Sequence, residues 1–309
     1  MSRSLLSVPA SHWRMVEKAV ASAADVVMLD LEDAVAPPEK VAARANVARA
    51  LRDLDWGASR RAYRVNGLDT PFFYRDLIEV VEQAGERLDL VIVPKVGRPE
   101  DVYLVVTLLD QVEAAVGLPP GRVRVGAQIE STQGLTRVER IAAASPRLAS
   151  LHFGPGDFAA SAGLPMTGIG VDDGYDEQYS GHRLHYPMSR IVVAARAAGI
   201  QAIDGPYADF TDPDGFRRSG VRARALGYRG KWCIHPSQIA LAREIFSPSA
   251  AELAWAEAVI AAYQAAASSG SGAARLGNQM IDAASLRLAR EIQALSSINP
   301  SVGRRPDPR

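Results

Sequence analysis

The segment DVVMLDLEDAVAPPEKVAARANVARAL, residues 25–51, contains the structural unit from which the fold can be predicted. An apolar run ends in acidic residues, and an alanine-rich stretch follows in which apolar residues recur every three or four positions. A continuous apolar run predicts a strand that is buried on both faces, and the recurrence predicts an amphipathic helix. The segment therefore indicates one strand–helix unit of a parallel sheet.

Eight units of this kind follow one another along the chain. We expect strands at Ser4–Pro9, Val26–Glu32, Ala62–Asn66, Leu90–Lys95, Val123–Glu130, Leu148–Phe153, Gln201–Gly205 and Lys231–Pro236. We expect helices at Ser11–Ala23, Pro38–Leu51, Thr70–Gln83, Pro99–Val116, Thr132–Ala144, Pro187–Ala198, Pro213–Leu226 and Ser237–Phe246. Joined by right-handed crossovers, these units predict an α/β protein with a (β/α)8 TIM barrel. An open doubly wound sheet is the alternative, but the glycine-rich phosphate turn that it normally carries is missing from the sequence.

The composition is that of an ordinary globular protein. Among 309 residues, 35 lysines and arginines balance 35 aspartates and glutamates, so the chain lacks the positive charge on which nucleic-acid binding depends. No apolar run approaches the roughly 18 residues of a membrane span, and the start MSRSLLSVPA does not fit a secretory signal. A single cysteine, Cys233, excludes an internal disulfide framework and a multi-cysteine zinc site. We expect a cytoplasmic protein without nucleic-acid or membrane partners.

Two domains are expected. Residues 1–247 account for the TIM-barrel catalytic domain, and residues 248–309 form a C-terminal helical extension. Within the extension, Ala250–Ala267 and Ala284–Leu295 are predicted helices, and the intervening SSGSG at 268–272 has the composition of a flexible linker. Such an extension can dock on its own barrel, or it can pack on or reach into a neighbouring subunit. We favour the neighbouring subunit.

Polar residues follow the strands, at the end of the barrel where enzymes of this fold bind their substrates. These strand-end residues are Asp30, Glu32, Asp33, Arg64, Asn66, Lys95, Glu130, Asp157, Asp204 and His235. Burying so many unpaired charges would be costly, so packing alone does not explain a ring of them. The pattern therefore indicates a functional site.

Glu130 ends one predicted strand and Asp157 comes after the end of the next, so their carboxylates can converge on one point. Two carboxylates with room for water are typical of a Mg²⁺ site, because Mg²⁺ takes few protein ligands and keeps several waters or substrate oxygens. The alternative is a purely structural pair of acids that Arg64 and Lys95 neutralise.

Groups that bind anions lie nearby in the sequence. Arg64, in RVN, has a planar guanidinium that suits a carboxylate or a developing oxyanion. Gly154 and Gly156, in GPGDF, let backbone N–H groups approach a ligand closely. These residues are candidates for substrate binding.

Two nucleophile mechanisms are weighed against the metal site. Lys95, at a strand end, could form a Schiff base, but several carboxylates nearby would hold its proton, so we favour an ion-pair role. Cys233 and His235 share one face of a strand, a poor arrangement for proton transfer between them. We expect a packed cysteine and a structural or ligand-lining histidine.

The motifs RSLLSVPA, DVVMLDLEDAV with Lys40 and Arg44, RVN, VPK, QIES, FGPGDF and GKWCIHPSQI occur in the order seen in one family. The chain resembles the citrate lyase β-subunit-like, or HpcH/HpaI aldolase, superfamily over roughly residues 3–295. IDGPYADF at 203–210 and the long GKWCIHPSQI segment most resemble malyl-CoA and β-methylmalyl-CoA lyases.

The resemblance implies a Mg²⁺-dependent CoA-thioester lyase, with Mn²⁺ as a substitute metal, assembled as a homotrimer or homohexamer. By motif, Glu130 and Asp157 match the metal ligands, and Arg64 matches the arginine that binds the thioester carbonyl. Asp33 matches an acid that holds a metal-bound water, and Asp282, in QMID, matches an acid/base that enters a neighbouring subunit's site. Substrate-binding residues are expected at Arg3, Arg64, Lys95, Gly154 and Gly156.

The expected reaction is retro-Claisen cleavage of malyl-CoA to acetyl-CoA and glyoxylate, with β-methylmalyl-CoA and citramalyl-CoA as further candidate substrates. The partners are then a CoA thioester and glyoxylate or a related 2-oxo acid. Three alternatives remain open: a citrate lyase β-subunit acting on a carrier-protein citryl thioester, a malyl-CoA thioesterase, and a CoA-binding sensor without activity.

Overall fold

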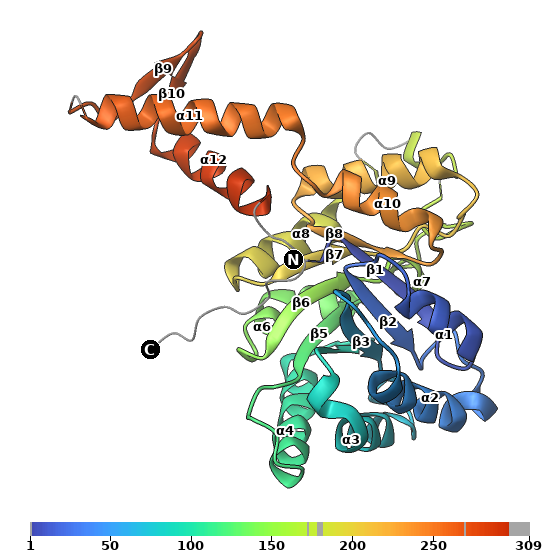
Figure 1. Cartoon of the computed structure of the whole chain (residues 1–309). Helices are drawn as coiled ribbons and strands as arrows, with labels where there is room; N and C mark the ends of the chain where they lie inside the picture. Colours follow the sequence, from blue (N-terminus) through green and yellow to red (C-terminus); the bar gives the residue numbers. More distant parts are fainter. Residues whose placement is uncertain (1, 172, 178–181, 269, 297–309) are drawn as a thin grey trace. The chain divides into compact units, whose positions relative to one another are not determined.

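The computed structural model describes residues 2–171, 173–177, 182–268 and 270–296, which fall into two compact units, Ser2–Arg243 and the residues from Glu244 onward. The first unit is a closed barrel of eight parallel strands in sequence order, with helices around it (Figure 1). The strands are β1 (Ser4–Pro9), β2 (Val26–Asp30), β3 (Arg60–Arg64), β4 (Leu90–Val93), β5 (Arg124–Ile129), β6 (Leu148–Phe153), β7 (Gln201–Asp204) and β8 (Gly230–Cys233). The predicted TIM barrel is confirmed.

Pairing of the first strand with the last closes the barrel. Leu5 of β1 pairs with Val26 of β2 on one side and with Trp232 of β8 on the other. All three residues belong to the buried cluster within the barrel, together with Met28, Ala62, Leu90, Ile92 and Ile203. Side chains alternate between the two faces of a strand, so the residues next to these face the helices. On β7, Ile203 faces inward and Asp204 therefore faces outward.

Helices cover the outside of the barrel. They are α1 (Trp13–Val20), η1 (Pro37–Glu39), α2 (Lys40–Asp53), α3 (Phe73–Ala84), η2 (Gly85–Arg87), α4 (Pro99–Ala115), α5 (Thr132–Thr136), α6 (Val138–Ala142), α7 (Pro155–Ala162), η3 (Tyr175–Glu177), α8 (His185–Ala197), α9 (Pro213–Leu226) and α10 (Ser237–Ile245). The prediction of one helix at Thr132–Ala144 is wrong, because the non-helical backbone of Arg137 divides it into α5 and α6. The short helix α7 was not predicted.

Several strands end earlier than the sequence indicated. Glu32, Asn66, Lys95 and Glu130 lie beyond β2, β3, β4 and β5, in the loops that follow these strands. The apolar run marks the strand, and the polar residues after it belong to the loops at the carboxyl end of the barrel. This is where the candidate site lies.

The second unit contains α11 (Ala250–Ser268), β9 (Ala274–Leu276), β10 (Gln279–Ile281) and α12 (Ala283–Ser296). Ala256, Val259, Ile281 and Ala289 form its buried cluster, and β9 and β10 pair as an antiparallel hairpin that the sequence did not predict. Residues 297–309 of the expected extension lie outside the described residues, and its packing on a neighbouring subunit stays a prediction. No helix in the described part of the chain is long and apolar enough to cross a membrane.

Candidate active site

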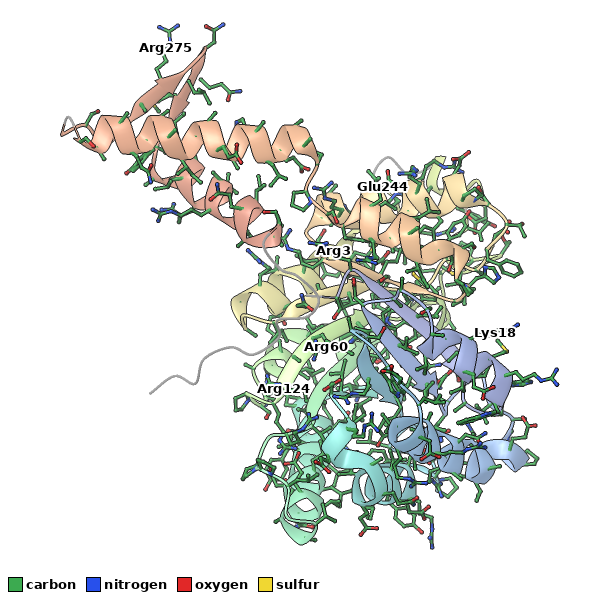
Figure 2. All side chains as sticks on the ribbon, viewed as in Figure 1. Arg3, Lys18, Arg60, Arg124, Glu244 and Arg275 are labelled. Atoms are coloured by element: carbon green, nitrogen blue, oxygen red, sulfur yellow. The ribbon has the colours of Figure 1, made fainter. Side chains whose placement is uncertain are left out.

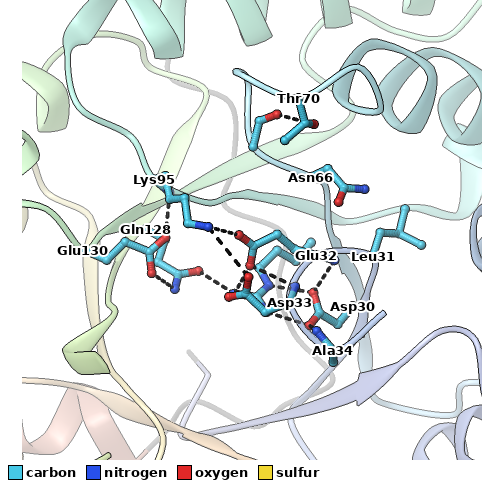
Figure 3. A network of polar contacts seen from close by, with 12 residues as sticks. Asp30, Leu31, Glu32, Asp33, Ala34, Asn66, Thr70, Lys95, Gln128 and Glu130 are labelled. Atoms are coloured by element: carbon cyan, nitrogen blue, oxygen red, sulfur yellow. Dashed lines mark hydrogen bonds and ion pairs between the residues drawn. The ribbon is translucent and has the colours of Figure 1, made fainter. Parts of the chain in front are cut away.

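Charged residues from neighbouring loops meet at the carboxyl ends of the strands (Figure 3). Glu130 follows β5 directly, and only 2% of its surface is exposed. The backbone N–H of Lys95, in the loop after β4, donates to Glu130 Oε1 at 2.7 Å, and the side-chain amide of Gln128 donates to Oε2. Lys95 has a φ of 54°, which is uncommon outside glycine and often marks functional sites. These contacts hold the Glu130 carboxylate in one orientation.

A second carboxylate lies close to Glu130. Asp157 is exposed in the first turn of α7, and burial together with this neighbouring charge raises the pKa of Glu130 to about 8. A divalent cation would relieve this repulsion, and Mg²⁺ commonly binds through one or two carboxylates while it keeps several waters. The donor set therefore fits Mg²⁺. Among the described residues, no cluster of three or more histidine, cysteine, aspartate or glutamate side chains is placed to hold a metal.

The two glycines of GPGDF have different surroundings. A Cβ at Gly154 would meet Glu130 Oε2 and the side chain of Gln128, so only glycine fits beside the buried carboxylate. A Cβ at Gly156 would meet Ile169 Cδ1 at 3.0 Å. Gly154 thus borders the site directly, whereas the space beside Gly156 is taken up by packing against Ile169.

Arg64, the last residue of β3, is buried and firmly paired. Its Nε and Nη2 donate to the two carboxylate oxygens of Asp30 at 2.7 and 2.6 Å. Nη1 lies 2.8 Å from Glu32 Oε2 and 3.5 Å from Gln128 Oε1, and the guanidinium lies 5.4 Å from the centre of the Trp232 ring. The bidentate pair with Asp30 fixes the plane of the guanidinium. The hydrogen bond to Gln128 is longer than those to Asp30, so a substrate oxygen could most easily replace it.

Lys95 connects the loop after β4 with the acidic loop after β2 (Figure 3). Its Nζ lies 2.8 Å from Glu32 Oε1 and 3.7 Å from Asp33 Oδ1. Burial alone would lower the pKa of Lys95, but these carboxylates outweigh it and hold the pKa above its ordinary value. Burial also raises the pKa of Glu32 to about 7, against the opposing effect of Arg64. A lysine that keeps its proton in this way suits an ion pair better than a Schiff base.

Asp33 lies at the outer edge of this group. Its side chain is half exposed, with Oδ2 3.8 Å from Arg64 Nη1. The structure thus brings together Glu130, Asp157, Gly154, Arg64, Lys95 and Asp33, as the sequence predicted; their catalytic roles stay predictions.

Three predicted residues lie elsewhere. Arg3 precedes β1, at the amino end of the barrel, on the same side as Arg60 and Arg124, which begin β3 and β5 (Figure 2). Arg3 therefore lies at the opposite end of the barrel from Glu130 and Arg64, and its role in substrate binding stays a prediction. Asp204 faces the helices, where it accepts a hydrogen bond from buried Lys231 at 2.5 Å. His235 is exposed and stacks on Phe210, with ring centroids 4.9 Å apart.

Cys233 and Asp282 lie outside this group of residues, and the contacts of each are structural ones. Cys233 is buried, and burial raises the pKa of its thiol to about 12, which argues against a thiolate nucleophile. Asp282 belongs to the second unit, where its Oδ1 accepts hydrogen bonds from the backbone N–H groups of Ala284 and Ser285 at 2.9 and 3.0 Å. It therefore caps α12. The N–H groups of Ser285 and Ala284 lower the pKa of the exposed carboxyl.

Two residues that contact the site were not singled out from the sequence. Gln128 donates to Glu130, and Trp232 lies beside Arg64 while its Nε1 donates to His152 Nδ1 at 3.0 Å. The alternation of a strand places residues 128 and 130 on one face, which is the signal that could have identified Gln128. No sequence pattern identifies Trp232 as a site residue, because aromatic side chains inside a barrel usually serve only to pack the core.

Comparisons with known proteins agree with this geometry. The model of the HpcH/HpaI aldolase/citrate lyase family matches residues 3–236. The L-malyl-CoA/β-methylmalyl-CoA lyase of Cereibacter sphaeroides is 46% identical over 297 residues, covering 94% of this chain and 93% of the relative. A (3S)-malyl-CoA thioesterase of the same species is 34% identical over 97% of this chain and 96% of its own length.

Among solved structures, protein CitE from Mycobacterium tuberculosis in complex with magnesium, acetoacetate and coenzyme A is 32% identical, with a TM-score of 0.75. That match covers 96% of this chain and 98% of the other. The resemblance predicted from the motifs is confirmed over nearly the whole chain. This protein belongs to the HpcH/HpaI aldolase/citrate lyase family.

Proposed function

We propose that this protein is a Mg²⁺-dependent lyase that cleaves the C2–C3 bond of a 3-hydroxyacyl-CoA thioester. Malyl-CoA, giving acetyl-CoA and glyoxylate, is the leading substrate, with β-methylmalyl-CoA or citramalyl-CoA as further candidates. The observation that carries the proposal is the buried Glu130 carboxylate beside Asp157. Lys95 and Gln128 hold this carboxylate, and Gln128 also contacts Arg64. The relative at 46% identity, which acts on L-malyl-CoA and β-methylmalyl-CoA by its name, supports this substrate class.

Glu130 and Asp157 are the residues that would hold Mg²⁺, or Mn²⁺ in its place. When bound, the cation supplies positive charge that stabilises the substrate's 3-hydroxyl oxygen as it loses its proton. The protein's own residues then supply orientation. Glu130 is fixed by two hydrogen bonds, and Asp33, exposed at the edge of the site, can accept a hydrogen bond from a water or a substrate hydroxyl.

Arg64 is the residue suited to the thioester carbonyl. Cleavage leaves negative charge on this oxygen as the enolate forms, and a guanidinium oriented in advance stabilises such charge without reorganising. Asp30 supplies that orientation through its two hydrogen bonds, which leave Nη1 as the group that a substrate oxygen can approach. The substrate hydroxyl loses its proton as the C2–C3 bond breaks, and the enolate carbon must then take one. Asp282 is the proposed donor to this carbon, after taking up the proton that the hydroxyl releases.

We expect Arg64→Lys to lower kcat/KM on the order of 10²–10³-fold, because lysine keeps the charge but loses the planar, bidentate geometry. The matched control is Arg61→Lys on the same strand. Arg61 pairs bidentately with Asp89 at 3.0 and 3.1 Å, at the other end of the barrel. Steady-state kinetics should show a large loss for the first variant only. Equal losses would remove Arg64 from the reaction.

The test of the function is the release of glyoxylate from (S)-malyl-CoA, followed as its phenylhydrazone with Mg²⁺ and then with EDTA. Mg²⁺-dependent glyoxylate together with acetyl-CoA supports the lyase. Free CoA thiol without glyoxylate would instead indicate a malyl-CoA thioesterase. Turnover of a carrier-bound citryl thioester alone would indicate a citrate lyase β-subunit, and CoA binding without turnover would indicate a sensor.

We further propose that the protein works in the cytoplasm as a homotrimer or homohexamer. In such an assembly, the extension of one subunit would bring Asp282 to the barrel of another. An exposed carboxylate at the start of α12 is available for that role. The free thiol of Cys233 suits a reducing compartment.

A further inference from the structure

Lys40, the first residue of α2, is a buried lysine outside the set of residues assigned to the reaction. Its Nζ donates to the backbone carbonyls of Leu31 at 2.9 Å and Glu32 at 3.0 Å, and to Asn66 Oδ1 at 2.5 Å. An ammonium group has three N–H donors, so all of them are used. Leu31 and Glu32 lie in the loop after β2, and Asn66 lies in the loop after β3. The Lys40 side chain therefore ties together two loops of the site.

The partner of Lys40 is itself anchored. Both the backbone N–H and the side-chain amide of Asn66 donate to Asp76 Oδ2, and the other oxygen of Asp76 accepts from Arg44 Nε at 2.9 Å. Asp76 is fully buried on α3, and Arg44 is buried one helical turn after Lys40 on α2. The network thus connects the two loops to the two helices behind them.

We propose that Lys40 is a positioning residue for the lyase reaction: it fixes the backbone of Glu32, and through Glu32 it sets the positions of Arg64 and Lys95. The inference rests on the proposed function. Its basis is that the Glu32 carboxylate lies 2.8 Å from Arg64 Nη1 and 2.8 Å from Lys95 Nζ, so a displaced Glu32 backbone displaces both contacts. Figure 3 shows the contact with Lys95. Lys40 acts from behind the loop, because its ammonium is occupied by protein oxygens and does not reach the substrate.

The charges around Lys40 allow a simpler role, which the experiment must separate. Asp30, Glu32, Asp33 and Asp76 are all near enough to interact with the ammonium electrostatically, so Lys40 could serve only to balance buried negative charge. Arg44 supplies a matched comparison. It is equally buried on the same helix and bonds to Asp76 and Glu79, but no described contact joins it to the loop after β2.

The variants are Lys40→Met, Lys40→Arg and Arg44→Met, each measured as the full-length, metal-loaded protein. We expect Lys40→Met to lower kcat about 10²-fold, as a misplacement of roughly 1 Å does, with KM changed much less. Lys40→Arg keeps the charge and N–H donors and should recover at least part of this loss. Through the described contacts, Arg44 reaches the loops only by way of Asp76 and Asn66, so Arg44→Met should lower the melting temperature with a much smaller loss of kcat than Lys40→Met. Equal losses of kcat in both methionine variants, or full activity in Lys40→Met, would overturn the proposal.

Hydrogen–deuterium exchange tests the same idea without activity. The backbone N–H groups of Glu32 and Ala34 donate to Asp30 at 3.0 and 3.3 Å, and they report on the loop. Lys40→Met should speed exchange in residues 31–35 severalfold, and Arg44→Met should not. An unchanged loop would overturn the positioning role even if the wild type is active. If Lys40→Met speeds exchange in the loop but the wild type does not cleave malyl-CoA, the proposed function is overturned. The contact between Lys40 and the loop is then still supported.

Discussion

Glu130→Gln is expected to lower kcat by about 10³-fold or more, because the variant loses one of the two carboxylates proposed to hold Mg²⁺, and a catalytic metal contributes several kcal/mol to the transition state. Glutamine has the size of glutamate, and its carbonyl oxygen can still accept the hydrogen bond from the backbone N–H of Lys95. Its new amide would face the amide of Gln128, which can turn over at the cost of its 3.5 Å contact with Arg64. The fold should therefore survive, and the measurement is steady-state kinetics with Mg²⁺.

Without metal, the same variant should be more stable than the wild type at high pH, because it lacks the buried charge that destabilises the wild type there. The pKa of Glu130 is raised from its ordinary value to about 8, so the folded metal-free protein holds this proton more tightly than the unfolded chain. The resulting stability is present at low pH and is lost as the pH rises from about 4.5 to about 8. In EDTA at pH 8.5 the variant should melt above the wild type, and the difference should shrink towards pH 5.

Thermal unfolding with added Mg²⁺ completes this test. A ligand that binds only the folded state raises its stability, so Mg²⁺ should raise the melting temperature of the wild type and not that of Glu130→Gln. Glu139→Gln is the control, because Glu139 forms a surface ion pair with Arg190 at 2.9 Å, outside the site. A Mg²⁺ response that persists in Glu130→Gln would show that the cation binds elsewhere.

The barrel could be predicted from the sequence because each strand is an apolar run, which can be identified without knowing which strands it pairs with. Val26–Asp30 is buried along its whole length, and this gives an unbroken signal. The hairpin of β9 and β10 gave none, since strands of three residues have no period to detect and owe their order to each other and to the helices around them. The break at Arg137 was missed for a related reason, because apolar spacing continues across it.

The site was predicted where residues at the carboxyl ends of the strands do face the active site. Lys95 and Glu130 do so because the loops after β4 and β5 are neighbours. Asp204 does not, since the alternation that turns Ile203 inward turns Asp204 towards Lys231. Arg3 was assigned by resemblance to a motif and not by a place at a carboxyl end, since it precedes the strand at Ser4–Pro9. The bonds of Lys40 to the carbonyls of the loop could not be predicted, because they depend on backbone positions that only the fold defines.

Asp282→Asn is expected to lower kcat by 10²–10⁴-fold, the usual contribution of a general acid or base, and to leave stability nearly unchanged. Asparagine caps helices about as well as aspartate, so α12 keeps its cap while the proposed proton carrier is lost. Asp282→Ala should lose both the activity and about 1 kcal/mol of stability. Ser249→Ala removes the side-chain cap of α11, in which Ser249 Oγ accepts from the N–H of Glu252, and should lose stability alone. A fully active Asp282→Asn would reduce Asp282 to a helix cap.

Mixing two inactive variants decides whether Asp282 acts in its own subunit or in a neighbour. The Asp282→Asn protein retains an intact Glu130, and the Glu130→Gln protein retains an intact Asp282. If an aspartate serves the barrel of another subunit, oligomers reassembled from both proteins contain some sites with both residues, and activity should return. If each aspartate serves its own barrel, every site lacks one residue and the mixture stays inactive. Activity of the mixture against that of either protein alone, at equal total concentration, is therefore the direct measurement of catalysis across subunits.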